Sequence, residues 1–263
     1  MINSRSNTQI KMIRKLREKK YRMESGLFFL EGIRIVLEAL EHKDQIQQLI
    51  VSRELLINHK AIQAVNQAGE EGVSVLEVSA EVFSTLSEKN GPQGLAAVAE
   101  QKWKTLPDLD QKFSGIWIAL HQVADPGNLG TIIRTLDGMD GKGVFLLDNC
   151  TDPYDPSSIR ASMGAIFRKE IIKTSSEEFR NYCILKEIPI IGASDKAQNN
   201  YHEFPYPQNM ILLMGSEREG IPPYLQEGCV DLVAIPMLGQ ADSLNLSVAS
   251  SIILYAILEH LNK

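Results

Sequence analysis

Three polar segments, each directly after an apolar run, carry the side chains of this sequence that could do chemistry. They are His121-Gln-Val-Ala-Asp-Pro-Gly-Asn-Leu-Gly-Thr-Ile-Ile-Arg134, Met214-Gly-Ser-Glu-Arg-Glu-Gly220, and Ile235-Pro-Met through Ser243-Leu-Asn-Leu-Ser-Val-Ala249. Their amide, guanidinium and carboxylate groups could orient a polar substrate and stabilise charge that develops on it. Glycines in each segment let the backbone approach a ligand closely.

Each segment also has a purely structural interpretation. Asn128 and Arg134 are six residues apart, about 240° around a continuous helix, so they converge only if Asn128 lies in the turn or caps the helix. Asn128 alone could be a helix cap, and Glu217 a solvated charge on a strand-to-helix turn. The polar residues of the third segment could all be alternative caps of the last helix, namely Ser243, Asn245 and Ser247.

The elements that position these segments alternate between helix and strand. Hydrophobic spacing in the first hundred residues predicts helices over 7–22, 33–42, 53–68 and 80–86, and strands over 27–30, 46–51, 73–78 and 95–99. From Gly115 onward we expect a turn over 125–127, strands over 116–120, 143–147, 189–192, 210–214 and 232–235, and helices over 129–139, near 156, and over 246–261. The later strands are continuously apolar, which is typical of a parallel sheet covered on both faces.

We therefore predict an α/β protein of two domains. A polar, proline-containing stretch separates them, which gives a first domain over 1–102, a linker over 103–113 and a second domain over 114–263. Ligands of an open parallel sheet bind beyond the carboxyl ends of its strands, and all three polar segments follow strands there.

Composition and missing motifs narrow the classes of function. The chain has 263 residues, 44% hydrophobic and 23% charged, as in folded globular proteins. Dinucleotide, phosphate-loop, zinc-protease and serine-hydrolase motifs are absent, so we expect no metal. No apolar stretch approaches the roughly 20 residues of a membrane span, and no secretory signal precedes the fold. Three distant cysteines without a C-x-x-C pair favour a reducing, cytoplasmic location; they are Cys150, Cys183 and Cys229.

Charge is distributed unevenly along the chain. The net charge is −6, yet residues 1–25 hold eight basic and two acidic side chains, against 19 basic and 31 acidic ones in the rest. A basic arm on an acidic body indicates nucleic-acid contact by one end of the molecule, although a solvated helix face is the alternative. The candidate RNA-binding residues are Arg5, Lys11, Arg14, Lys15, Lys19 and Arg34.

Together and in this order, the three segments resemble the three motifs of the SpoU (TrmH) family of RNA ribose 2′-O-methyltransferases, in the SPOUT superfamily. Residues 1–100 also resemble, less specifically, the substrate-binding domain of many such enzymes, a relative of kink-turn-binding ribosomal proteins. Gly26-Leu-Phe-Phe-Leu-Glu-Gly-Ile-Arg34 and Gly91-Pro-Gln-Gly-Leu95 carry that second resemblance. This domain combination is more usual in enzymes that act on ribosomal RNA.

The family resemblance implies a fold, a cofactor and an assembly. The fold is a parallel-sheet domain whose C-terminal segment forms a trefoil knot, preceded by a smaller α/β RNA-binding domain. The cofactor is S-adenosylmethionine, and the assembly is a homodimer whose site is completed across subunits. The positions that match the family's cofactor contacts are Gly215, Ile235, Met237 and Leu244.

The resemblance also implies roles in 2′-O-methylation of a ribose in ribosomal RNA, most readily of the large subunit. Arg134 would stabilise the developing alkoxide, and Asn128 would hold Arg134 or the ribose. Glu217 would orient the site, while Ser243 and Asn245 would shape the cofactor loop. Two alternatives stay open: the same chemistry on transfer RNA, and an RNA-binding module without activity.

Overall fold

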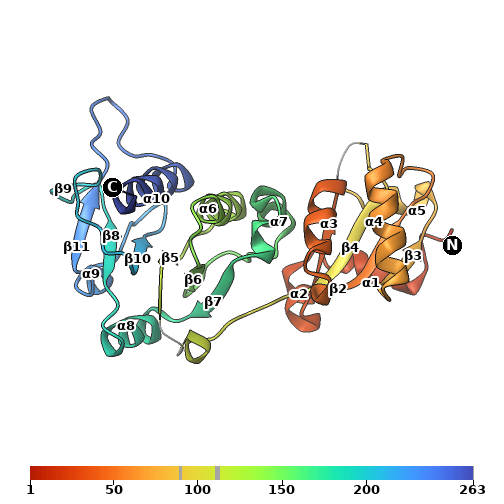
Figure 1. Ribbon diagram of the computed structural model, residues 1–263, viewed down its shortest axis with the longest axis horizontal. Coiled ribbons are helices and arrows are strands. Elements are labelled where there is room, and N and C mark those ends of the chain that lie inside the picture. Colours follow the sequence, from red (N-terminus) through yellow and green to blue (C-terminus); the bar gives the residue numbers. More distant parts are fainter. Residues whose placement is uncertain (89–90, 110–112, 263) are drawn as a thin grey trace. The chain divides into compact units, whose positions relative to one another are not determined.

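The chain folds into two compact units, and each unit is made of two separate segments of the chain. The computed structural model describes residues 1–88, 91–109 and 113–262 (Figure 1). The first unit comprises residues 1–102 and 154–167, and the second comprises 103–153 and 168–263. The segment 154–167, which the sequence analysis placed in the second domain, thus packs with the first unit. Residues 110–112 of the expected linker lie outside the described part.

The first unit is built on a mixed four-stranded sheet with the strand order β1-β4-β2-β3. Among the described strand pairs of this sheet, β2–β3 is parallel and the other two are antiparallel. The strands are β1 (Leu27–Glu31), β2 (Ile46–Val51), β3 (Ser74–Glu77) and β4 (Leu95–Glu100). The helices are α1 (Thr8–Lys15), α2 (Lys19–Ser25), α3 (Ile33–Leu40), α4 (His59–Glu70), α5 (Ala80–Leu86) and α7 (Pro156–Ser162), with short 3-10 turns η1 (Lys43–Gln45) and η3 (Ala165–Phe167).

The predicted helix over residues 7–22 is wrong as a single element, because the chain breaks between α1 and α2. Glu18 is extended there (φ −91°, ψ 130°) and begins α2. The Arg22 guanidinium, 1% exposed, donates hydrogen bonds to the carbonyls of Leu16 (3.0 Å) and Arg17 (2.6 Å). A buried arginine therefore satisfies carbonyls that the interrupted helix leaves without amide partners.

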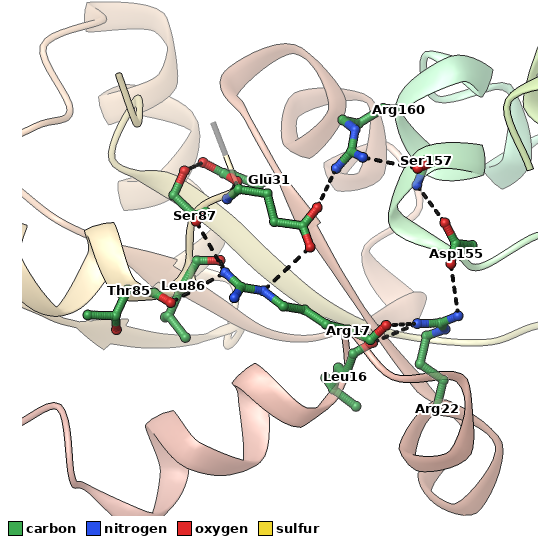
Figure 2. A network of polar contacts seen from close by, with 11 residues as sticks. Leu16, Arg17, Arg22, Glu31, Thr85, Leu86, Ser87, Asp155, Ser157 and Arg160 are labelled. Carbon is green, nitrogen blue, oxygen red and sulfur yellow. Dashed lines mark hydrogen bonds and ion pairs between the residues drawn. The ribbon is translucent and has the colours of Figure 1, made fainter. Parts of the chain in front are cut away.

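Arginines of the basic arm also tie the 154–167 segment into the first unit. Arg22 contacts Asp155, the N-cap of α7, at 3.3 Å. Arg17 donates to three carbonyls around residue 86 and lies 3.5 Å from Glu88, which in turn accepts from Arg160 at 2.7 Å. Figure 2 shows this network. Part of the arm's positive charge is thereby used for structure.

The predicted helix over residues 53–68 begins later, at His59. Leu55 and Leu56 instead form a turn whose amides donate to the Ser52 carbonyl. Asn58 then caps α4 by accepting from the Ala61 amide at 3.0 Å. The side-chain cap, rather than hydrophobic spacing, decides where the helix begins.

The second unit is an α/β layer on a parallel sheet, which confirms the predicted fold class. Its strand order is β7-β6-β5-β10-β8-β11-β9, and every described pair is parallel. The strands are β5 (Ile116–His121), β6 (Gly143–Leu147), β7 (Glu170–Thr174), β8 (Ile190–Ala193), β9 (Asn199–Asn200), β10 (Met210–Met214) and β11 (Asp231–Ala234). β5, β6 and β10 are buried along their whole length, as continuously apolar strands predict.

Helices cover both faces of this sheet. They are α6 (Pro126–Gly138), α8 (Ser176–Leu185), α9 (Pro223–Gln226) and α10 (Leu246–Leu261), with a 3-10 turn η2 (Leu106–Leu109). β7, α8, β9 and α9 were not expected from the sequence. α10 packs against α6, where Thr135 and Ser251 share a hydrogen bond of 2.9 Å. In the described part of the chain, no helix has the length and hydropathy of a membrane span.

Candidate active site

The first polar segment begins α6 earlier than the sequence predicted. The expected turn at Asp125-Pro-Gly127 is the first turn of the helix: Asp125 is the N-cap, and its carboxylate accepts from the Asn128 amide at 2.6 Å. Proline fits the first position because its missing N–H has no partner there. Asn128 therefore neither lies in a turn nor caps the helix.

The second polar segment is a tight turn after β10. Ser216 and Gly220 exchange two backbone hydrogen bonds of 3.2 and 3.1 Å. A β-carbon on Gly215 would lie 1.9 Å from the carbonyl carbon of Gly220, so only glycine fits at Gly215. The turn presents Glu217 and Arg218 at its exposed tip.

The third polar segment ends at the N-cap of α10. Asn245 accepts from the amides of Ser247 (2.9 Å) and Val248 (3.3 Å), which decides among the three predicted caps. Its Oδ1 is used by the helix, so its side-chain amide nitrogen is the group that can reach another residue.

A chain of side-chain hydrogen bonds joins the three segments. Asn245 Nδ2 donates to Asn128 Oδ1 at 3.1 Å, and Asn128 Nδ2 donates to Glu217 Oε1 at 3.2 Å. The three residues are far apart in sequence. They meet because β5 and β10 are neighbouring strands and α10 packs on α6. The structure thus brings together three of the five predicted catalytic residues.

These three residues border a cavity of about 660 Å³ at the carboxyl end of the sheet. Its volume is within the range of small-molecule sites, roughly 300 to 1,000 Å³. Gln122, Ser216, Arg218 and Glu219 also line it, and we had not predicted them as site residues. Gln122 has a φ of 51°, a left-handed conformation that a non-glycine residue seldom adopts. All four belong to the first or second polar segment, but their residue types alone did not distinguish them from their neighbours.

The other two predicted catalytic residues lie apart from this cluster. Arg134 is six residues further along α6 than Asn128, is exposed, and has no side-chain hydrogen-bond partner among the residues that the structure describes. Ser243 is exposed in the loop before α10. Because both belong to one continuous helix, Asn128 and Arg134 are about 240° apart around its axis and their side chains do not converge within one subunit.

The predicted cofactor residues are not among the residues that line this cavity. Gly215 is buried, Ile235 is half-buried, and Met237 and Leu244 are each 36% exposed. In the described chain, no hydrogen bond engages the peptide groups of residues 236–244. This loop therefore offers free backbone donors and acceptors beside exposed apolar side chains.

The first segment begins with a buried histidine. His121, 5% exposed, has its Nε2 3.3 Å from Asp148, which also accepts from the amide and hydroxyl of Ser176. Burial lowers the pKa of His121, and the neighbouring carboxylate of Asp148 opposes this effect. His121 is therefore neutral at neutral pH and connects the ends of β5 and β6.

The predicted RNA-binding residues divide into two groups. Arg14 donates to the Thr85 hydroxyl at 2.9 Å, and Arg5 pairs with Glu81 at 2.8 Å. Lys15 lies 4.7 Å from the centre of the Tyr21 ring. The remaining cations are exposed and have no protein partner in the described chain, namely Lys11, Lys19 and Arg34.

Within the described part of the chain, no cluster of three or more His, Cys, Asp or Glu could hold a metal ion.

Comparison with known families gives two matches that together span most of the chain. Residues 115–255 match the SpoU rRNA Methylase family, which covers all three polar segments. Residues 7–97 match the MRM3-like substrate binding domain.

Individual proteins are similar over nearly the whole length. The 23S rRNA (guanosine(2553)-2′-O)-methyltransferase RlmP of Bacillus subtilis is 28% identical over 97% of both chains. The 23S rRNA (guanosine-2′-O-)-methyltransferase RlmB of Bordetella pertussis is 31% identical over 86% of this chain and 94% of its own. The AdoMet-bound rRNA methyltransferase of Sinorhizobium meliloti superposes with a TM-score of 0.89 and 32% identity, covering 99% of this chain and 97% of that one.

Proposed function

Because the chain belongs to the SpoU rRNA Methylase family, we propose that it transfers a methyl group from S-adenosylmethionine to a ribose 2′-hydroxyl in ribosomal RNA, most readily that of the large subunit. The observation that carries the proposal is the hydrogen-bonded chain from Asn245 through Asn128 to Glu217, which joins all three motifs at one cavity. The relatives from Bacillus and Bordetella are both named as 23S rRNA 2′-O-methyltransferases.

The residues present fit the cofactor. S-adenosylmethionine supplies an electrophilic sulfonium methyl group when it is bound. The free peptide groups of residues 236–244 can hydrogen-bond an adenine edge, while Met237 and Leu244 offer apolar contact. Gly215 lets the turn of the second polar segment pack closely against the backbone of Gly220, and Ile235 connects β11 to the loop.

Arg134 would supply the main stabilisation of the reacting oxygen. A ribose hydroxyl is a poor nucleophile, so the site must align it in line with the methyl group, which can account for about 7–11 kcal/mol of the barrier. The arginine side chain stays protonated in proteins, so its role is to stabilise the developing negative charge. Asn128 and Glu217 then orient the ribose or the guanidinium, and Ser243 and Asn245 shape the cofactor loop.

The position of Arg134 supports a site shared by two subunits. It is exposed on α6 near the packing contact with α10, whose Val248 and Tyr255 are 47% and 51% exposed. We propose that this face of α10 forms a homodimer interface and that Arg134 acts on a cofactor held by the partner. We also propose that the C-terminal segment forms a trefoil knot, as membership of the family implies.

We further propose that each domain has its own role and that the protein is cytoplasmic. The first domain would hold RNA, supported by the match to a substrate-binding family, and the second would transfer the methyl group. A cytoplasmic location is supported by three free cysteines. Burial raises the pKa of the Cys150 thiol to about 11, so it stays protonated at neutral pH.

Two measurements test the function and the shared site. Labelled methyl groups from S-adenosylmethionine should enter a transcript of ribosomal RNA, and nucleoside digestion should recover them as 2′-O-methylribose. Label on a base would contradict the reaction. Mixing inactive Arg134→Ala and Asn245→Ala proteins should restore activity, because each mixed dimer regains one complete site. No recovery in mixed dimers would contradict sharing across subunits.

A further inference from the structure

The first unit contains a cavity of about 680 Å³ to which the methyl-transfer motifs contribute nothing. The two segments that carry the resemblance of this domain meet there: Ile33 from residues 26–34, and Pro92 and Gln93 from residues 91–95. The start of α4 forms the rest of the wall, including Ile57 and Lys60. Three stretches distant in sequence thus build one concave surface.

Backbone contacts fix these walls relative to one another. Gly94 has a φ of +75°, and a β-carbon there would lie 2.6 Å from the Leu56 nitrogen. The Gly94 carbonyl accepts from the Ser52 amide at 2.9 Å, and the Gly32 amide donates to the Leu95 carbonyl at 3.0 Å. The cavity is therefore largely preformed, which reduces the ordering cost of binding.

Four polar side chains line the cavity, Asn58, His59, Lys60 and Gln93, and the two amide side chains among them have only their donors left. Gln93 Oε1 accepts from the Ile33 amide at 3.1 Å, and Asn58 Oδ1 accepts from the Ala61 amide at 3.0 Å. Their amide nitrogens, like the Lys60 ammonium, have no partner among the described residues. Two amide NH₂ groups and one cation favour a ligand rich in acceptors, while the His59 imidazole can either donate or accept.

The two helices that begin at the cavity carry no negative charge in their first turns. The first turns of α3 and α4 contain no acidic residue, although the chain as a whole is acidic. Exposed Arg34 follows Ile33 in the first turn of α3. An anionic group would therefore be attracted here.

The remaining wall is apolar and exposed. Ile57 is 83% exposed, and it lines the cavity with Ile33 and Pro92. A nucleotide combines the features that this lining complements: a flat face that covers apolar side chains, and base carbonyl and phosphate oxygens that accept hydrogen bonds.

We propose that this cavity binds one unstacked nucleotide of the RNA substrate, with its acceptor groups on Gln93, Asn58 and Lys60 and its base over Ile57. This proposal rests on the proposed function, because it assigns the cavity to the same RNA. It locates recognition at a single-stranded position, where bases are free to enter a pocket.

The test is binding of the full-length protein to an unmodified transcript of large-subunit ribosomal RNA. Ile57→Asp with Lys60→Glu should weaken binding at least tenfold, without changing the melting temperature or the affinity for S-adenosylmethionine. The matched control is Leu185→Asp with Lys196→Glu, an exposed leucine and lysine of the second unit that undergo the same changes in charge. Lys60→Arg should retain binding.

Crosslinking provides a second readout that does not depend on the variants folding. A 4-thiouridine-substituted transcript should crosslink to the peptides that contain Ile57 or Gln93. Equal losses in the cavity and control variants, or crosslinks confined to other surfaces, would overturn the cavity proposal while wild-type methyl transfer still upheld the function. Absence of RNA binding and methyl transfer by the wild-type protein would overturn both.

Discussion

The two units assemble their candidate functional residues in different ways. In the second unit, a parallel sheet places the ends of β5 and β10 side by side, so two compact motifs meet without further adjustment. In the first unit, the cavity draws on three distant segments, and the basic residues divide between structure and surface. A site at the end of a parallel sheet can be recognised in the sequence, whereas a site built by tertiary packing cannot.

The largest expected effect sharpens this contrast on the catalytic side. Arg134→Ala should lower turnover at least a hundredfold, about 2.7–4 kcal/mol, because it removes one donor to the developing charge. Affinity for S-adenosylmethionine, measured by calorimetry, should be unchanged, and Arg134→Lys should rescue poorly because it lacks a planar fork of donors. Lys196→Ala is the control for an exposed cation of the same unit. Near-normal turnover of Arg134→Ala would refute the assignment.

The next effect concerns the structural arginine of the first unit. Arg22→Ala should lower the free energy of unfolding by about 2–3 kcal/mol, since it leaves two carbonyls and Asp155 without their partner. Urea unfolding followed by circular dichroism measures this loss. Lys19→Ala, an exposed cation of the same arm, should change stability by less than about 0.5 kcal/mol. Similar values for both variants would contradict the division between structural and surface cations.

Two glycine substitutions, one in each unit, should change the free energy of unfolding in opposite directions. Gly215→Ala should cost about 1–3 kcal/mol and weaken cofactor binding, because its β-carbon would meet the Gly220 backbone at 1.9 Å. Gly69→Ala, near the end of α4, would place its β-carbon at an ordinary contact distance of 3.6 Å from Val75 and should stabilise the protein by up to about 1 kcal/mol. Thermal unfolding compares the two. If Gly215→Ala left the stability unchanged, the turn after β10 would not be closely packed.

Charge reversal in the basic arm tests its role in binding. Lys11→Glu, Lys15→Glu and Lys19→Glu together should weaken RNA binding about tenfold and flatten its dependence on salt, because fewer phosphate counterions are released. Filter binding across a salt series measures both quantities. Reversal of Lys142, Lys186 and Lys196 in the second unit is the control. An unchanged affinity and slope would leave these lysines as a solvated helix face.

The smallest effect is a pH dependence that originates at His121. Burial lowers its pKa in the folded state, so the unfolded chain binds a proton first as the pH falls below about 6.5. The stability of the wild-type protein should therefore decrease as the pH falls below about 6.5, and the stability of His121→Gln should decrease less. Urea midpoints between pH 7 and 5 measure the difference. Parallel curves for the two proteins would exclude a contribution from His121.

Several sequence predictions failed for identifiable physical reasons. The Asp125-Pro-Gly127 segment was predicted as a turn, although an N-cap followed by proline also begins a helix, as it does here. β7 and α8 were missed even though Ser175 and Glu178 form a capping box that marks the start of α8. The burial of Arg22 has no sequence signal, because it depends on where the chain breaks between α1 and α2.

The candidate site was predicted in part. Asn128, Glu217 and Asn245 were named from their motifs, and the structure joins them by hydrogen bonds. The left-handed conformation of Gln122 was not foreseen, since glutamine does not indicate a positive φ. The cavity of the first unit was not foreseen because its lining is defined by packing.

The most direct test of the proposed function is labelled methyl transfer to unmodified transcripts of large-subunit ribosomal, small-subunit ribosomal and transfer RNA in parallel, with Arg134→Ala as the inactive control. We expect label on a ribose of large-subunit RNA with the wild-type protein and none with Arg134→Ala. Label confined to transfer RNA would contradict the role assigned to the first unit while preserving the chemistry. No transfer to any transcript or to intact ribosomal subunits would contradict the central claim.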